Sequence, residues 1–246
     1  MPQPRFLTSG DTAVVVEFGV GIDRHISALV LALAQRIDEA GIDGIVETVP
    51  TFRSLMIHYD PLRLPQVRLK ARLADLLQDL RPSEAVGRLW RIPACYDPRL
   101  GPDLDEVAER LGLSVADVVR LHSTETYHVY MLGFLPGYPY MGDLPSLLVL
   151  PRRNSPRIKV PPGSIAIAMA MTAVYPLESP GGWHLLGRTP VPLWDLRRET
   201  PVLLRPGDKV KFDPIHLGEF NALLARAEAG TLRLKPEHAA VAGAIP

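Results

Sequence analysis

Apolar and polar positions in the first eighty residues alternate between the two-residue period of a strand and the longer period of a helix. Apolar side chains recur at helical spacing over residues 26–37, with Asp23 placed to cap that helix and Gly41 to end it. A second helix is expected over residues 65–80. Strands are predicted at three short apolar runs: residues 13–18, 45–49 and 54–58. The order βαββα favours a small α+β domain of the split-βαβ type.

The rest of the chain combines short helices with a long region of strand and turn patterns. Of the 25 prolines, 14 lie between residues 136 and 214, and the apolar runs there are short. Many short strands separated by Gly/Pro turns predict a barrel or a sandwich. The expected elements are strands at 88–93 and 126–132, a strand pair over 202–212, and helices over 103–111, 114–122 and 216–229.

The polar segment 81–87 is the preferred boundary between two domains, residues 1–84 and residues 85–246. The final residues, 236–246, are small and apolar without periodicity, so we expect a loosely held tail after the terminal helix. A chain of 246 residues is long enough for two modest cores, which agrees with this division.

The charge balance and the single cysteine limit the classes of function. The chain has 27 basic and 27 acidic residues, so its formal net charge is zero. Nucleic-acid and anionic-membrane surfaces need a basic excess, and no apolar run approaches the roughly 18 residues that span a bilayer. Cys95 is the only cysteine, which fits a reducing compartment, and the N-terminus lacks the apolar core of a signal peptide. We therefore expect a cytoplasmic protein that binds neither nucleic acid nor membrane.

Three loops rich in proline and glycine, at residues 133–142, 151–164 and 175–188, are the most informative feature for function. Proline fixes φ and glycine opens conformations closed to other residues, so such loops are held in specific shapes. Binding and catalysis tend to sit on loops of this kind. A β-domain with many tight turns is the alternative, because it would show the same composition.

The loops and the helix before them carry the candidate site residues. Arg157 and Arg188 could bind a carboxylate or phosphate, and His122 lies at a helix C-terminus, where the dipole favours imidazolium. These three are the candidate catalytic residues; solvated loop charge and a histidine that only complements its helix end are the alternatives. The candidate substrate-binding residues are aromatic walls, hydroxyls and glycine amides: Tyr140, Thr172, Tyr175, Ser179, Gly181, Gly182 and Trp183.

Several catalytic signatures are missing from the sequence. It contains neither a Gly-x-Ser-x-Gly elbow nor a His-Glu-x-x-His motif, and its seven histidines are too scattered to predict a metal site. Cys95 is interpreted as a small buried hydrophobe. An ATP-using hydrolase needs a phosphate cradle, metal-binding carboxylates and a positioned base, and few carboxylates lie near the loops. The chain therefore has the composition of part of an active site.

The order of the irregular motifs resembles one family. The motifs are Gly133-Phe-Leu-Pro-Gly-Tyr-Pro-Tyr-Met-Gly142, Val160-Pro-Pro-Gly-Ser164, Tyr175-Pro-Leu-Glu-Ser-Pro-Gly-Gly-Trp183 and Gly187-Arg-Thr-Pro190. They follow a His-Ser-Thr-x-x-Tyr segment at residues 122–127. Together they resemble the family of the 5-oxoprolinase B subunit, allophanate hydrolase subunit 1 and the sporulation kinase inhibitor KipI, over nearly the whole chain.

The resemblance implies an α+β N-terminal domain followed by a mainly-β, cyclophilin-like barrel domain. It implies a partner of the KipA type (the 5-oxoprolinase C subunit), with which the chain builds one composite site, and a further partner of the LamB/YcsF type (the A subunit). The assembled complex would open 5-oxoproline to glutamate with ATP and magnesium. This chain would be inactive alone, with no cofactor firmly bound.

One segment departs from the family pattern. Where the family commonly reads Gly-Gly-Gln-Thr-Gly-x-Tyr-Pro, residues 169–176 read Met-Ala-Met-Thr-Ala-Val-Tyr-Pro. At Met171 a glutamine amide becomes a thioether, which loses a donor and an acceptor. A more apolar pocket with a changed substrate, or none, is one interpretation; methionine packing on a strand is the other.

Two further functions stay open from the sequence. A KipI-like module would dock on a histidine kinase and lower its autophosphorylation. A subunit of the allophanate hydrolase or carboxyltransferase type would act on a urea-derived substrate, as paired domains do in the urea amidolyases. The resemblance covers all three roles, so it identifies the family better than the reaction.

Overall fold

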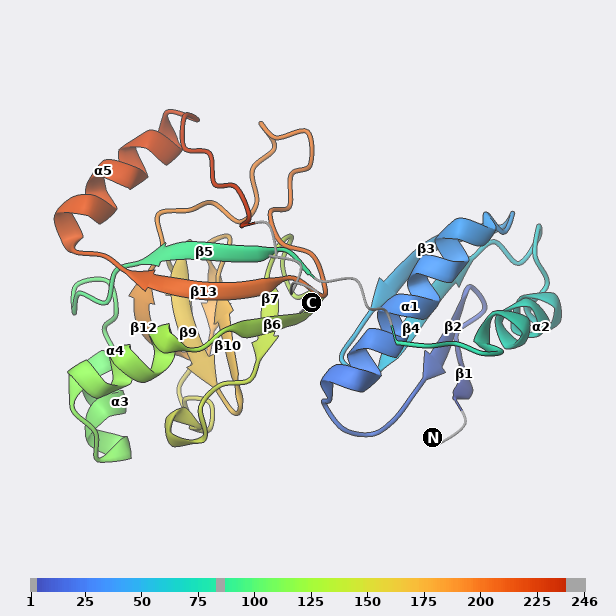
Figure 1. The fold of residues 1–246 in the computed structure, drawn as a ribbon, viewed down its shortest axis with the longest axis horizontal. Helices are drawn as coiled ribbons and strands as arrows, with labels where there is room; N and C mark the ends of the chain where they lie inside the picture. Colours follow the sequence, from blue (N-terminus) through green and yellow to red (C-terminus); the bar gives the residue numbers. More distant parts are fainter. Residues whose placement is uncertain (1–3, 83–86, 238–246) are drawn as a thin grey trace, which may run out of the picture. The chain divides into compact units, whose positions relative to one another are not determined.

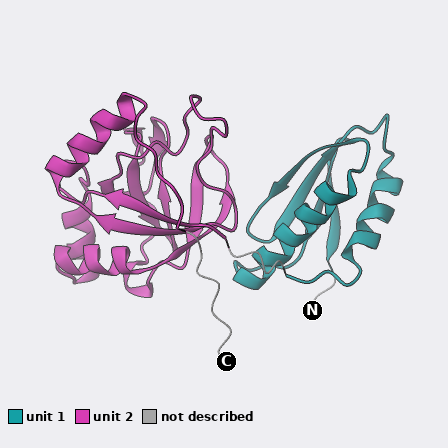
Figure 2. Ribbon diagram, turned by 45° about the horizontal axis from the view of Figure 1, so that its top comes forward, with its two compact units in different colours: residues 1–85 teal, residues 86–246 magenta. Residues whose placement is uncertain are grey.

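The computed structural model describes residues 4–82 and 87–237 and divides into two compact units (Figure 2). The units are residues 1–85 and residues 86–246. The domain boundary expected between residues 84 and 85 lies outside the described residues, and so does the expected tail from residue 238 onward.

Unit 1 is a four-stranded antiparallel sheet with two helices on one face (Figure 1). Its elements are β1 (Arg5–Ser9), β2 (Ala13–Glu17), α1 (Arg24–Ala40), β3 (Ile45–Pro50), β4 (Ser54–Tyr59) and α2 (Gln66–Leu77). The strand order across the sheet is β1-β2-β4-β3. The expected βαββα order lacks the first strand, because β1 is a mostly exposed edge strand without a clear apolar alternation.

The core of unit 1 lies between the sheet and the helices. Val16 of β2 and Ile57 of β4 are completely buried on the inward face and share one apolar cluster with Leu33 of α1 and Leu69 of α2. Each such side chain contributes about 1.5–3 kcal/mol when fully buried. The helix boundaries follow local signals: Asp23 Oδ1 accepts from the amides of residues 25 and 26 at 2.8 and 3.0 Å, and Gly41 ends α1 in the left-handed conformation.

Unit 2 is a seven-stranded sheet curled into a nearly closed barrel (Figure 1). Its strands are β5 (Leu89–Ala94), β6 (Tyr127–Leu132), β7 (Pro139–Gly142), β9 (Ser164–Ala168), β10 (Met171–Val174), β12 (His184–Arg188) and β13 (Lys209–Pro214), in the order β12-β9-β10-β7-β6-β13-β5. A separate two-stranded ribbon pairs β8 (Arg157–Val160) with β11 (Ser179–Gly181). The helices are α3 (Leu104–Leu111), α4 (Val115–Thr124) and α5 (Leu217–Glu228), with a 3₁₀ turn at Ser146–Leu148.

One residue pair joins the two edges of the barrel. Cys95, directly after β5, donates its amide to the Arg188 carbonyl at 2.8 Å, and the Arg188 amide donates back to the Cys95 carbonyl at 2.9 Å. A Cβ at Gly187 would lie 2.4 Å from the Cys95 carbonyl oxygen, so only glycine allows this approach. The expected fold class, an α+β unit followed by a mainly-β barrel, is confirmed.

The strand pair expected over residues 202–212 forms only in its second half. Val202 makes an isolated bridge to Trp194, whereas β13 begins at Lys209. The turn between them is organised by Asp208, which is 3% exposed and accepts hydrogen bonds from Arg88 Nη2 at 2.6 Å and from Trp90 Nε1 at 3.1 Å. These hydrogen bonds hold the turn against β5, where the sequence had predicted the first strand of a hairpin.

Candidate functional site

The structure separates the candidate residues of unit 2 into four places. His122 and Thr172 lie in a buried hydrogen-bond chain, and the aromatic residues form a cluster outside the barrel wall. Arg157, the first residue of β8, lies in an ion-pair network. Arg188 lines a pocket at the closing edge of the barrel.

His122 and Thr172 belong to a chain of hydrogen bonds inside the barrel. The Thr172 hydroxyl donates to the Ala166 carbonyl at 3.1 Å, so it accepts from His122 Nε2 at 2.9 Å. His122 Nδ1 then accepts from the Tyr96 hydroxyl at 2.8 Å, and the ring stacks on Phe212 with centroids 4.9 Å apart. Every member of this chain is satisfied by a neutral partner.

The expectation of an imidazolium at His122 is wrong. The side chain is completely buried, and burial lowers its pKa to about 3, so the ring is neutral at physiological pH. The cost of removing the charged ring from water outweighs the favourable helix dipole. With no exposed surface, His122 cannot contact a ligand directly in this conformation; its catalytic assignment stays a prediction.

The expected pocket walls do gather in space, around a tyrosine that the sequence did not single out. The ring of Tyr138 lies edge-on to Tyr175 at 5.1 Å and to Trp183 at 6.2 Å between centroids, and Tyr140 lies 6.1 Å from Trp183. Burial raises the pKa of Tyr138 and Tyr175 above the usual value, so both are neutral phenols. Arg152 lies over the Trp183 ring at 6.0 Å.

The residues of this cluster are buried against one another, so they also form a second small hydrophobic core. Trp183 is 4% and Tyr175 1% exposed, and a Cβ at Gly181 would lie 2.4 Å from the Tyr175 hydroxyl oxygen. Met171, where the family pattern has glutamine, packs partly buried against the cluster. Met169 occupies the hairpin turn before β10 with a positive φ of 54°. The departure from the family pattern therefore adds apolar packing at this cluster.

Arg157 is engaged by an acid that sequence reasoning treated only as a helix start. Asp103, which is 2% exposed, accepts from Arg157 Nη2 at 2.5 Å, from Arg153 Nη1 at 2.8 Å and from the Leu185 amide at 2.7 Å. Arg153 also reaches Glu106 at 3.1 Å. The network pins the arginine-rich loop to the start of α3 and to β12, and the assignment of Arg157 to catalysis stays a prediction.

The expected anion-facing donors lie next to this network. Ser179 and Gly181 pair with Val160 and Arg157 in the β8–β11 ribbon, and the Gly182 carbonyl accepts the Arg153 amide at 2.8 Å. The Ser179 hydroxyl is buried without a hydrogen-bond partner among the described residues. Their role in binding an anion stays a prediction, because the described contacts are with the protein itself.

Arg188, in contrast, reaches a pocket. The pocket has a volume of about 260 Å³ and lies between the end of β12, the turn at residues 161–163 and α5. Arg188 Nε donates to the Pro162 carbonyl at 2.6 Å, and among the described residues no carboxylate lies within ion-pair distance of its guanidinium. Burial lowers its pKa, although an arginine stays charged at all accessible pH values.

Two of the three expected loops, residues 151–164 and 175–188, meet at this pocket. The Gly163 carbonyl accepts the Thr189 amide at 2.9 Å, and the Gly163 amide donates to the Tyr175 carbonyl at 2.6 Å. Gly163 has a φ of 82°, and a Cβ there would lie 2.4 Å from the Thr189 carbonyl oxygen and 3.5 Å from Arg188 Nε. Glycine is therefore required for the turn to contact the arginine.

Metal ligands and membrane-spanning helices can be assessed over residues 4–82 and 87–237. That part of the chain contains no cluster of three or more potential metal ligands. None of its helices is long and apolar enough to cross a membrane.

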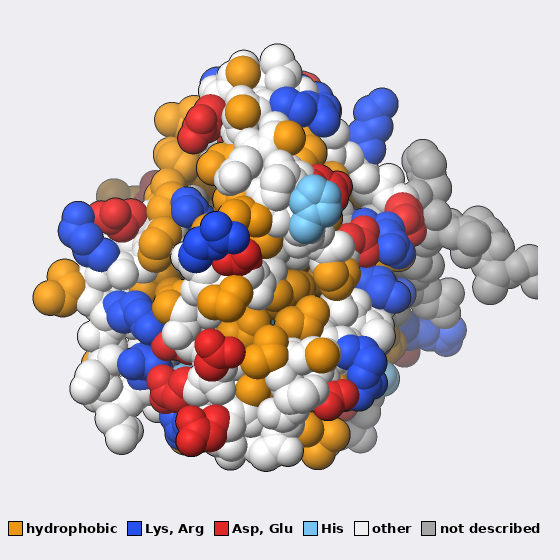
Figure 3. Space-filling model, turned by 90° about the vertical axis from the view of Figure 1, so that its left-hand side faces the viewer, with side chains coloured by type: hydrophobic (Ala, Val, Ile, Leu, Met, Phe, Trp, Pro, Cys, Tyr) orange, Lys and Arg blue, Asp and Glu red, His pale blue; other side chains and the backbone are white. Residues whose placement is uncertain are grey.

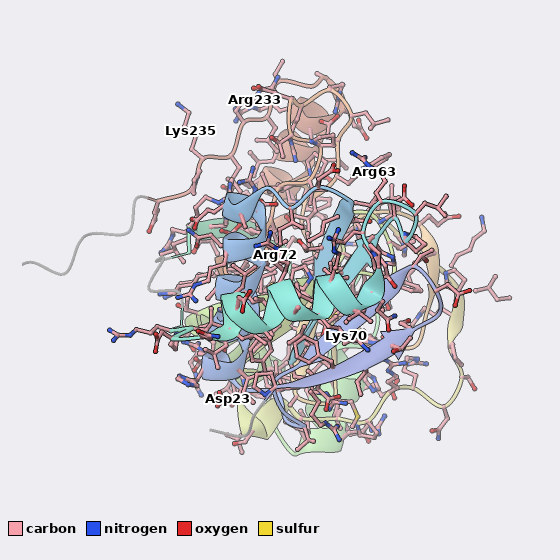
Figure 4. The ribbon with its side chains drawn as sticks, turned by 90° about the vertical axis from the view of Figure 1, so that its right-hand side faces the viewer. Asp23, Arg63, Lys70, Arg72, Arg233 and Lys235 are labelled. Atoms are coloured by element: carbon pink, nitrogen blue, oxygen red, sulfur yellow. The ribbon has the colours of Figure 1, made fainter. Side chains whose placement is uncertain are left out.

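Unit 1 offers a different kind of surface. A groove of about 720 Å³ beside α2 is lined by Arg63, Arg68 and Arg72, together with Asp43 and Asp75. Figure 4 shows Arg63 and Arg72 on this side of the unit. The charges are of both signs, and Arg63 is paired with Asp43, so the groove is not a strongly basic anion site.

Comparison with known proteins identifies the family. Residues 4–204 match the family described as carboxyltransferase domain, subdomain C and D. The chain is 38% identical to the 5-oxoprolinase B subunit of Bacillus subtilis, covering 87% of this chain and 93% of that protein. The chain belongs to this carboxyltransferase-domain family. The 5-oxoprolinase B subunit of Escherichia coli O157:H7 is 41% identical, covering 87% of this chain and 97% of its relative.

A solved structure shows the same fold. The urea amidolyase of Kluyveromyces lactis superposes with a TM-score of 0.80 over 96% of this chain and 17% of that protein. At 21% sequence identity this likeness establishes the fold alone. The family resemblance expected from the loop motifs is confirmed by the matching family and by the two 5-oxoprolinase relatives.

Proposed function

We propose that this chain is the B subunit of a 5-oxoprolinase-type amidohydrolase, which opens 5-oxoproline to glutamate with ATP. The observation that carries the proposal is the identity of 38–41% to two proteins named as the B subunit of 5-oxoprolinase, along 93–97% of their length. A match over nearly the full length of both proteins includes both the loops and the scaffold that positions them.

The described geometry supports a chain that supplies part of a site. Arg188 lines a pocket and has no ion-paired carboxylate among the described residues, whereas the other candidate arginine, Arg157, is paired with Asp103. His122 is completely enclosed with both ring nitrogens hydrogen-bonded, so in this conformation it offers a substrate no accessible general base. We propose that ATP, magnesium and the remaining catalytic groups come from a KipA-type partner (the C subunit) and a LamB/YcsF-type partner (the A subunit), and that the complex is cytoplasmic.

The test is reconstitution with the partner subunits. The chain is co-expressed with the A-type and C-type subunits, and ATP-dependent release of glutamate from 5-oxoproline is measured with and without it. We expect turnover that requires all three subunits and no turnover by this chain alone. A complex that forms and releases glutamate equally well without this chain would contradict the proposal.

The family description favours a second candidate, a carboxyltransferase-type subunit. For this candidate we keep the urea-derived substrate that was expected from the sequence. A stable complex that ignores 5-oxoproline and consumes a urea-derived acid would establish it. The expectation of a kinase-regulating module stays a prediction; it requires binding to a histidine kinase in the absence of the partner subunits.

A further inference from the structure

The pocket beside Arg188 combines a cation with rigid apolar walls. The walls come from Pro162, Pro176, Val191 and Leu224, which approach from four separate segments of unit 2. Proline rings have no rotatable side chain to reorganise, so little conformational entropy is lost when a ligand packs against them. The walls suit a compact ligand with an apolar body.

The pocket lining carries three charged residues: Arg188, Arg197 and the acid Glu228, which makes no ion pair with Arg188 among the described residues. The other arginine on the lining, Arg197, is occupied by Asp195 through Nε at 2.8 Å and Nη2 at 2.9 Å. Arg188 uses only Nε within the described residues, on a carbonyl oxygen that carries no full charge. Its terminal nitrogens therefore keep donors for an anion, and the guanidinium fork matches the two oxygens of a carboxylate.

The guanidinium is also held in place before any ligand binds. Its backbone is fixed on both sides, to Cys95 across the barrel closure and to Ser164 of β9. The side chain is fixed by the Pro162 carbonyl, and the turn that carries this carbonyl is fixed by Gly163. Such preorganisation lowers the entropic cost of binding.

The size of the pocket limits the ligand. At about 260 Å³ it lies below the roughly 300–1,000 Å³ of pockets for drug-sized molecules. Figure 3 shows one face of unit 2, on which apolar side chains gather in the middle with charged side chains around them. A small acid with one carboxylate and a compact ring fits both the volume and the chemistry of the lining.

We infer that this pocket is a carboxylate-binding site for a small cyclic acid, with Arg188 pairing the carboxylate and the proline-rich walls contacting the ring. The guanidinium and the apolar walls all belong to this chain, so the purified chain should bind the acid without a partner. The assignment to a small monocarboxylate rests on Arg188 and the apolar lining, whereas the ring, and 5-oxoproline in particular, rest on the proposed function.

Ligand titration of the purified full chain tests the inference. ¹⁵N-labelled chain is titrated with 5-oxoproline, with proline, with the uncharged lactam 2-pyrrolidinone and with inorganic phosphate, and NMR shifts are followed. We expect saturable shifts of the Gly163, Thr189 and Val191 amides with a cyclic acid, and binding about 10- to 100-fold weaker for the lactam and for phosphate. Absence of saturable shifts with either acid would overturn the inference.

Three variants separate binding from folding. Arg188→Met should weaken acid binding about 10- to 100-fold, and Arg188→Lys should give an intermediate loss because it keeps the charge without the fork. Leu224→Trp fills the pocket from α5 and leaves Arg188 in place, so it should abolish binding in a folded chain. Arg120→Met, an exposed arginine of α4 paired with Asp117, is the matched control and should bind as the wild type does.

Failure of the inference differs from failure of the proposed function. Acid binding at these amides without turnover by the reconstituted complex would keep the pocket and overturn the 5-oxoprolinase proposal. The opposite result is turnover by the complex with no acid binding to this chain and with unchanged kinetics for Arg188→Met and Leu224→Trp. It would keep the 5-oxoprolinase proposal and overturn the assignment of the pocket.

Discussion

At the scale of single residues, burial decides which candidates can act on a ligand. His122 looked like a charged group at a helix end, yet it lies inside the barrel with both ring nitrogens hydrogen-bonded. The sequence shows the helix end but not the barrel that encloses it. Arg188 was singled out on the same kind of local argument, and the structure places it beside a pocket with no ion-paired acid among the described residues.

The buried neutral histidine predicts a pH-dependent stability. Its folded-state pKa of about 3 lies below the unfolded value of about 6.5, so between these values the unfolded chain binds one proton more. The stability it contributes is complete above pH 6.5 and falls as the pH drops towards 3. Between pH 7 and pH 5 we expect wild type to lose about 2 kcal/mol more than His122→Gln.

Urea unfolding at both pH values measures this difference. Glutamine keeps a donor and an acceptor but does not titrate. All other ionisable residues contribute equally to wild type and variant, so the difference between the two measures the contribution of His122. Equal losses in wild type and variant would contradict the buried neutral state of His122.

Met169 carries backbone strain in the hairpin turn between β9 and β10. It has a positive φ of 54°, a conformation that costs a non-glycine residue about 1 kcal/mol or more. Met169→Gly should therefore raise the free energy of unfolding by about 1 kcal/mol, measured by urea denaturation. Ala170→Gly, in the same turn but without a positive φ, should lower it by about 0.5–1 kcal/mol. A loss in both variants would contradict the strain.

At the scale of elements, short-range signals in the sequence predicted the helices, whereas the contacts between elements depend on residues far apart in the sequence. The caps at Asp23 and Ser114 lie next to the helices they start, so the sequence alone places those helices. The ion pair between Arg157 and Asp103 joins residues 54 apart in sequence, and only the folded chain brings β8 next to the start of α3. Sequence reasoning therefore found the loops but missed the acid that holds one of them.

Asp103 should be a strong determinant of stability in unit 2. Asp103→Asn removes the charge that two partly buried guanidinium groups share, so we expect a loss of about 2–3 kcal/mol in the free energy of unfolding. Asp105→Asn, exposed on the same first turn of α3, should change it by less than about 0.5 kcal/mol. Similar effects of both substitutions in urea unfolding would contradict the network.

At the scale of the whole molecule, the fold class and the family could be predicted from the sequence. The proline- and glycine-rich motifs occur in a fixed order along the chain, and that order is specific to one family. The pocket did not follow, because its walls come from four segments that meet only in the folded barrel. The proposed role accounts for both observations: a rigid barrel holds one substrate-binding pocket, and partner subunits supply the rest of the catalytic machinery.

The most direct test is the steady-state kinetics of the reconstituted three-subunit complex with 5-oxoproline, comparing wild type, Arg188→Met and Arg120→Met in this chain. We expect ATP-dependent glutamate release with a kcat/KM about 10- to 100-fold lower for Arg188→Met and unchanged for Arg120→Met. Equal kinetics for all three complexes, or no glutamate release from a stable wild-type complex, would contradict the role proposed for this chain.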